Sequence, residues 1–158
     1  MSDHFSAISL FVEDIRDEVA GTHSIIGIMP DNISVPDAPV TLPKIGIYTR
    51  ILLHPDFDPQ PIEIVLAKDE NEQSLTTIGV ELSEQTLRES REAGSNICGL
   101  ISKMVVAPFQ VRTAGRVRVL ARTPRFEVES GTLNVVVNPS PTVSQPPSEQ
   151  SPPDVPAS

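Results

Sequence analysis

The chain has 158 residues, of which 39% are hydrophobic, and its formal net charge is −9. This length suits one domain with a substantial core, and the acidic balance disfavours nucleic acid and anionic membranes as partners. A single cysteine excludes an internal disulfide framework, and no apolar stretch approaches the roughly 18 residues that a membrane span needs. The first residues lack the basic region of a signal peptide, so the sequence predicts a soluble, cytoplasmic protein.

Short apolar runs, many of them alternating with polar residues, fill the chain up to residue 137. They span residues 7–12, 23–29, 44–53, 62–67, 75–82, 97–106, 116–121, 126–128 and 133–137. Turn residues separate most of them, and the core must be built from Ile, Val and Leu because aromatic residues are few. Because no long helices are predicted between these strands, the sequence predicts an all-β fold. We expect a single β-sandwich of about 7–9 mostly antiparallel strands.

One short surface helix is predicted near residues 83–93. Ser83 is placed as its N-cap, Leu82 and Leu87 have the spacing of a hydrophobic staple, and Gly94 supplies a stop. The segment carries almost no apolar stripe. We therefore expect it to lie on the surface as an excursion between two strands.

The composition changes sharply after residue 137. Residues 138–158 hold seven of the sixteen prolines, and Ser and Gln fill most of the remainder. Such a segment cannot bury enough apolar surface to offset the entropy of ordering it. The sequence thus predicts a β-sandwich domain over residues 1–137 and a disordered Pro/Ser-rich tail over 138–158, which acts as a linker or docking segment.

Four carboxylates and one arginine follow the first apolar run, at Glu13, Asp14, Arg16, Asp17 and Glu18. Clustered carboxylates are suited to a hard cation such as Ca²⁺ or Mg²⁺, or to a catalytic pair in which one pKa is raised. The acids do not form the D-x-D-x-D-G pattern of a calcium loop, and Gly21 lets the chain reverse before the next strand. We favour a solvated hairpin turn over residues 13–18, which still offers a candidate binding surface.

The motifs "LFVEDIRDEVAGTHSIIGIM", "LPKIGIYTRI", "FQVRTAGRVRVLA" and a final "GTLNV" strand resemble an uncharacterised family of small bacterial proteins, a domain of unknown function. The resemblance covers the chain from about Ile8 to Val137. It implies a compact β-sandwich and brings no activity, cofactor or catalytic residue with it. The excursion over residues 83–96 departs from the family's pattern.

A basic segment lies within this acidic chain. No Asp or Glu occurs between Ala93 and Phe126, whereas six basic residues do. Alternation places Arg116, Arg118 and Arg122 on one face of a strand, where guanidinium groups could bind an anion or an acidic partner. Pairing of these arginines with acids of neighbouring strands, such as Glu63, Glu127 and Glu129, is the interpretation we favour.

No zinc, nucleotide or nucleophile motif is present, and the three histidines are isolated. We therefore expect a non-catalytic binding or scaffolding module without cofactor or metal, and among such roles we favour protein–protein interaction. The opposite charges of its two halves also permit a homo-oligomer. Its candidate surfaces are the acidic segment, the arginine face and any open sheet edge. Two alternatives stay open. One is a metal-assisted hydrolase using Glu13, Asp14 and Asp17, to which the fold could add His54 and Asp56. The other is anion or nucleotide binding by the arginine face over residues 112–125.

Overall fold

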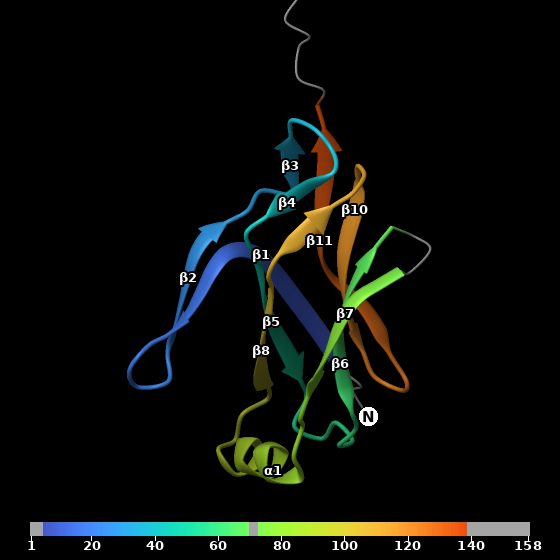
Figure 1. Ribbon diagram of the computed structural model, residues 1–158. Coiled ribbons are helices and arrows are strands. Elements are labelled where there is room, and N and C mark those ends of the chain that lie inside the picture. Colours follow the sequence, from blue (N-terminus) through green and yellow to red (C-terminus); the bar gives the residue numbers. More distant parts are fainter. Residues whose placement is uncertain (1–4, 70–72, 139–158) are drawn as a thin grey trace, which may run out of the picture.

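The computed structural model describes residues 5–69 and 73–138, and strands make up most of this part of the chain (Figure 1). The predicted all-β class is confirmed. The predicted tail begins at residue 138, and residues 139–158 lie outside the described residues. In the described ranges the strands form two main sheets and one short ribbon.

The first sheet has four antiparallel strands in the order β2-β1-β5-β8. They are β1 (Phe5–Asp17), β2 (His23–Ile28), β5 (Ile45–Leu53) and β8 (Cys98–Val106). The second sheet has the order β3-β11-β10-β6-β7. Its strands are β3 (Asn32–Val35), β6 (Ile62–Lys68), β7 (Gln73–Val80), β10 (Gly115–Arg122) and β11 (Glu127–Val137). All its pairs are antiparallel except β3 with β11. Strands β4 (Val40–Leu42) and β9 (Phe109–Val111) form the ribbon.

One hydrophobic core lies between the two main sheets. Because side chains alternate along a strand, each sheet contributes every second residue to it, among them Ile47 and Ile51 from β5, Ile64 from β6, Val119 from β10 and Leu133 from β11. Within this core the two backbones approach each other closely where β1 crosses β11. A Cβ atom on Gly131 would lie 2.8 Å from the carbonyl oxygen of Ser9, so only glycine fits there without a shift.

Three buried hydroxyl groups connect the two sheets at this crossing. The Oγ of Ser9 lies 2.7 Å from Thr49 Oγ1 and 2.7 Å from Ser130 Oγ, and Ser130 Oγ donates to the carbonyl of Val119 at 3.1 Å. Each hydroxyl has one proton, and the proton of Ser130 is used on Val119. Ser9 must therefore donate to Ser130, and Thr49 to Ser9, which gives a directed chain of three hydrogen bonds.

The helix α1 (Glu84–Glu92) begins and ends close to where the sequence predicts. Ser83 is its N-cap and accepts a hydrogen bond from the backbone N–H of Thr86 at 3.2 Å. Leu87 is fully buried, and the guanidinium of Arg91 donates to the carbonyl of Pro55 at 2.9 Å. These two contacts attach the helix to one end of the sheets, where Figure 1 shows it.

The strand count exceeds the predicted 7–9, because the described residues contain eleven. Three short strands, β3, β4 and β9, were not predicted. The sequence predicts two separate strands at residues 126–128 and 133–137, but the single strand β11 runs through both. Between Glu129 and Gly131 the pairing with β10 shifts by one residue, so Ser130 is the extra residue of a β-bulge. The bulge points the side chain of Ser130 toward the core, where its hydroxyl joins the hydrogen bonds with Ser9 and Val119.

Candidate binding surfaces

The acidic segment is the end of a long strand, and the predicted hairpin turn over residues 13–18 is wrong. Strand β1 continues to Asp17, and its partner β2 begins at His23. The turn between them is closed by a hydrogen bond from the N–H of Glu18 to the carbonyl of Thr22 at 2.9 Å. Pairing with β2 extends β1 to Asp17, five residues beyond the apolar run at residues 7–12.

Basic side chains bind the two aspartates of this segment. Asp14 accepts hydrogen bonds from Lys44 and, at 3.1 Å, from Arg16. Asp17 accepts one from Lys103. The hydrogen bonds from Lys44 and Arg16 hold the pKa of Asp14 below its usual value, and the bond from Lys103 does the same for the pKa of Asp17. Both carboxylates therefore favour the ionised form, which is the opposite of a raised pKa for a general acid.

The residues invoked for a metal-assisted hydrolase do not come together. Phe5 pairs with Leu53, so His54 and Asp56 lie beside the start of β1, nine residues or more from Asp14. Nine strand residues correspond to about 30 Å. Among residues 5–69 and 73–138, no three His, Cys, Asp or Glu side chains are grouped so that they could hold a metal ion. In the described part of the chain the fold therefore does not add His54 and Asp56 to the acidic segment.

The arginine face lies on the outer side of β10, and its members pair with acids of β11. Arg116 and Arg118 both contact Glu129, the latter at 3.5 Å, and Arg122 contacts Glu127. The cross-strand pairing that the sequence predicts is therefore present. Arg118 also covers the small buried cluster of Val65, Ala67 and Leu120 on this side of the sheet, as its side chain is only 15% exposed.

Glu129 gives this face an acid-dependent contribution to stability. A hydrogen bond from Thr132, together with the nearby Arg116 and Arg118, holds the pKa of Glu129 below its usual value. A carboxyl with a lowered pKa contributes stability that is complete above the unfolded-state pKa and is lost as the pH falls through the folded-state value. We expect Glu129→Gln to lower the thermal midpoint at pH 7 and to change it little at pH 3, which differential scanning calorimetry across pH 3–7 measures. An equal loss at both pH values would contradict this assignment.

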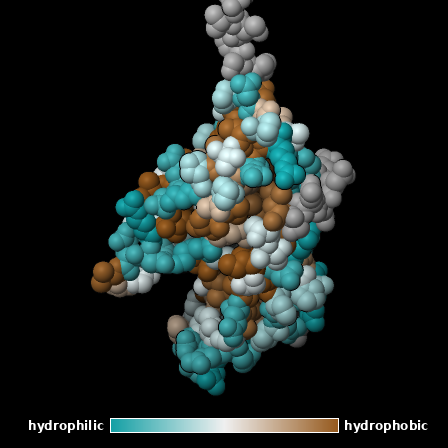
Figure 2. Space-filling view, in the orientation of Figure 1, coloured by the Kyte–Doolittle hydropathy of each residue, from teal (hydrophilic) through white to brown (hydrophobic). Residues whose placement is uncertain are grey.

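A more open surface lies between β7 and β8, which are edge strands of the two sheets, and we call it the seam. Each of these strands pairs with one neighbour in the described part of the chain, β7 with β6 and β8 with β5. Residues of both strands, including Ile78 from β7 and Leu100 from β8, line one shallow hollow. Leu75 is 43% exposed and Ile78 37% exposed. Figure 2 shows hydrophobic side chains reaching the surface in the middle of the face that it views.

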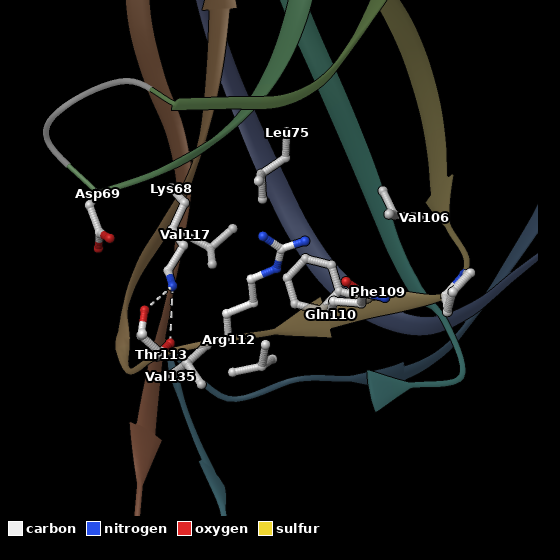
Figure 3. A pocket seen from close by; sticks show the side chains of 12 residues that line it. Lys68, Asp69, Leu75, Val106, Phe109, Gln110, Arg112, Thr113, Val117 and Val135 are labelled. Carbon is white, nitrogen blue, oxygen red and sulfur yellow. Dashed lines mark hydrogen bonds between the residues drawn. The ribbon is translucent and has the colours of Figure 1, made fainter. Parts of the chain in front are cut away.

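A deeper pocket of about 540 Å³ continues this seam toward the β9 ribbon. Its apolar walls come from Leu75, Val106, Phe109, Val117 and Val135. Leu75 reaches it because it is the extra residue of a second β-bulge, where the pairing of β6 shifts from Thr76 to Ser74. The lining also includes three charged residues, Lys68, Asp69 and Arg112 (Figure 3).

The basic side chains of the described residues differ in whether they form hydrogen bonds or ion pairs. Ten of the twelve Lys and Arg side chains form a hydrogen bond or ion pair within the described ranges, and Arg50 and Arg112 form none. Arg50 lies on the outer face of β5, between Ile8 and Ile101 of the adjacent strands. Arg112 lies at the pocket. Sequence reasoning placed Arg112 with the other arginines, because nothing in the sequence shows which of them are paired.

Comparison with known proteins adds no assignment. No protein-family model matches the chain, and no curated protein matches it significantly. The resemblance to an uncharacterised bacterial family therefore stays a prediction. In the part of the chain that the structure describes, α1 is the longest helix, and it is too short and too polar to cross a membrane.

Proposed function

We propose that this protein is a non-catalytic protein-binding module that holds an extended segment of its partner along β7. The observation that carries the proposal is an open sheet edge beside an exposed apolar seam. In such binding the partner's backbone extends the sheet, and its alternate side chains enter the neighbouring hollows. The proposal includes a cytoplasmic location and a partner other than nucleic acid, in keeping with the net charge of −9.

Strand β7 lacks the devices that usually protect an edge. Natural edge strands carry charged residues, prolines or inward-pointing charges that discourage pairing with another chain. The eight residues of β7, QSLTTIGV, include no charged residue and no proline. The edge strand β8, on the other side of the seam, carries Lys103, which binds Asp17. An unprotected edge with exposed Leu75 and Ile78 supports strand addition at β7 rather than at β8.

The charges around β7 favour a partner segment with basic ends. Asp69 precedes the strand at the β6–β7 turn, and the exposed Glu81 follows it. If a second copy paired with β7 in the antiparallel sense, Asp69 of one copy would lie near Glu81 of the other. Like charges would then face each other at both ends of the pair. A segment with Thr and Val in its middle and Lys at its ends complements both the strand and its flanks.

The alternative activities have less support in this geometry. The register separates His54 and Asp56 from the acids of β1, so these two residues cannot assist a metal-assisted hydrolase site there. Anion binding by Arg116, Arg118 and Arg122 would compete with their pairs to Glu127 and Glu129.

Backbone hydrogen exchange with a defined peptide tests the proposal. The probe is a short peptide of alternating threonine and valine with lysines at both ends, and its matched control has glutamates in place of the lysines. We expect the lysine peptide to slow exchange in β7 by roughly tenfold or more, because new strand pairing protects edge amides. The glutamate peptide should protect these amides far less.

The variant Ile78→Lys provides a second comparison. A lysine here places an inward-pointing charge on the edge and should abolish protection by the lysine peptide. Ile78 is already 37% exposed, so the fold tolerates the change. Ile8→Lys, at a 60% exposed position on β1, is the matched control and should bind as the parent does. Protection that survives Ile78→Lys, or no protection at millimolar peptide, would refute the proposal. So would dimerisation through β7 in light scattering.

A further inference from the structure

The structure assigns the pocket beside β9 as a binding site for a small monocarboxylate with an apolar tail. The site is independent of strand addition at β7, although the two share Leu75. It combines an apolar chamber with a small excess of positive charge.

The chamber has the size and lining of a small-molecule site. Its volume of about 540 Å³ lies within the range of ligand pockets, roughly 300–1,000 Å³. The ring of Phe109 and the side chains of Val117 and Val135 form its inner wall, and both β-branched residues are almost completely buried. This wall favours a short aliphatic or aromatic tail over a polar body.

Arg112 supplies the anion-binding group. Its guanidinium points into the pocket in Figure 3, and it forms no ion pair or hydrogen bond with any other residue that the structure describes. The neighbouring arginines of β10 are held by Glu127 and Glu129. Among the described residues, Arg112 is therefore a cation whose donors are free, and a planar guanidinium matches a carboxylate through two parallel hydrogen bonds.

Lys68 supplies a second, oriented cation. Its ammonium group donates to the carbonyl of Thr113 at 3.0 Å and to the Thr113 hydroxyl at 2.6 Å, as the dashed lines in Figure 3 show. Both acceptors are neutral, so the positive charge of Lys68 is not cancelled. An ammonium has three donors, and two are used, which leaves one for a ligand.

The sum of charges selects a monoanion. Arg112 and Lys68 contribute two positive charges, and Asp69 contributes one negative charge to the same lining. Asp69 is fixed there, because its Oδ1 accepts a hydrogen bond from the backbone N–H of Arg116 at 2.9 Å. A net charge of one suits a carboxylate, whereas a phosphate monoester with two charges would be repelled by Asp69.

Titration of the full chain with octanoate, followed by amide chemical shifts, tests the assignment. We expect saturable shifts at Phe109, Gln110 and Thr113. The uncharged analogue octan-1-ol should bind roughly tenfold more weakly or worse, because it lacks the charge that Arg112 recognises. Octyl phosphate should also bind more weakly than octanoate.

Two arginine variants make the result specific. Arg112→Gln should weaken octanoate binding by roughly tenfold or more. Arg50→Gln removes the other arginine without a partner in the described ranges, and should leave the affinity within twofold of the parent. Equal weakening by both variants, or octanol binding as tightly as octanoate, would overturn the assignment. So would an absence of shifts at the pocket. Because no peptide is used, these outcomes are separate from those of the β7 experiment.

Discussion

Replacing Gly131 by alanine is expected to destabilise the protein by about 2–3 kcal/mol, a cost typical of an overpacked interior. The added Cβ would lie 2.8 Å from the carbonyl oxygen of Ser9 and 3.0 Å from the Ser9 Cβ. Backbone cannot move aside as a flexible side chain can, so β1 and β11 must separate. The shift in thermal midpoint should be roughly 10 °C for a domain of this size, measured by calorimetry or circular dichroism.

Gly99→Ala is the matched control. Gly99 also lies in a strand, and a Cβ there would meet only Leu52 Cδ2, at 3.9 Å. We expect a change within about 0.5 kcal/mol, or a slight gain because alanine has less freedom than glycine in the unfolded chain. If the two variants had the same stability, the close approach of β1 and β11 would be wrong.

This crossing also determines where the molecule is open. Strand β1 lies between β2 and β5, and β11 lies between β3 and β10, so the sheets meet on the β2/β3 side. The opposite side, bounded by β7 and β8, carries the seam and the pocket. Contact at Gly131 therefore holds the sheets together on one side, while the proposed binding surfaces lie on the other.

The fold class and the helix could be predicted because their signals are local. Alternation in runs such as residues 44–53 reports one buried face, and β5 buries that face as expected. Ser83, Leu87 and Gly94 mark a helix through capping and staple rules that act over a few residues. These features depend on residues that are close together in the sequence, so they can be predicted from one sequence alone.

Other features depend on residues far apart, and the sequence does not show them. The Ser-Gly-Thr segment at residues 130–132 is typical of a turn, yet Gly131 is required by its contact with Ser9, 122 positions away. Strands β3, β4 and β9 are too short to show a period, and each is stabilised by its pairing partner. Likewise, Asp14 and Asp17 look like a free acidic cluster until Lys44 and Lys103 are brought to them.

The candidate sites also have some features that the sequence predicts and others that depend on contacts between distant residues. The sequence identified an arginine-rich segment and the general importance of open edges. It could not show that Arg116, Arg118 and Arg122 are paired whereas Arg112 has no partner in the described ranges. That distinction comes from which strands are neighbours. The edge position of β7 follows from the strand order, which alternation alone does not determine.

The second large loss of stability is expected for Ser9→Ala, which interrupts the three hydrogen-bonded hydroxyls near Gly131. Ser9 is the middle member, so its removal leaves the Thr49 hydroxyl without its acceptor and Ser130 without its donor. Thr49 is 1% exposed, and water cannot readily replace the lost partner. We expect a loss of about 1–3 kcal/mol, the cost of leaving buried polar groups unsatisfied, as measured by urea unfolding.

Ser6→Ala is the control, since Ser6 is exposed on the same strand and should change stability by less than about 0.5 kcal/mol. The triple variant Ser9→Ala, Thr49→Val, Ser130→Ala separates two explanations. If the loss in Ser9→Ala comes from unsatisfied partners, removing all three hydroxyls should cost less than the sum of the three single changes. Strict additivity would show three independent contacts and would contradict a directed chain that joins the two sheets.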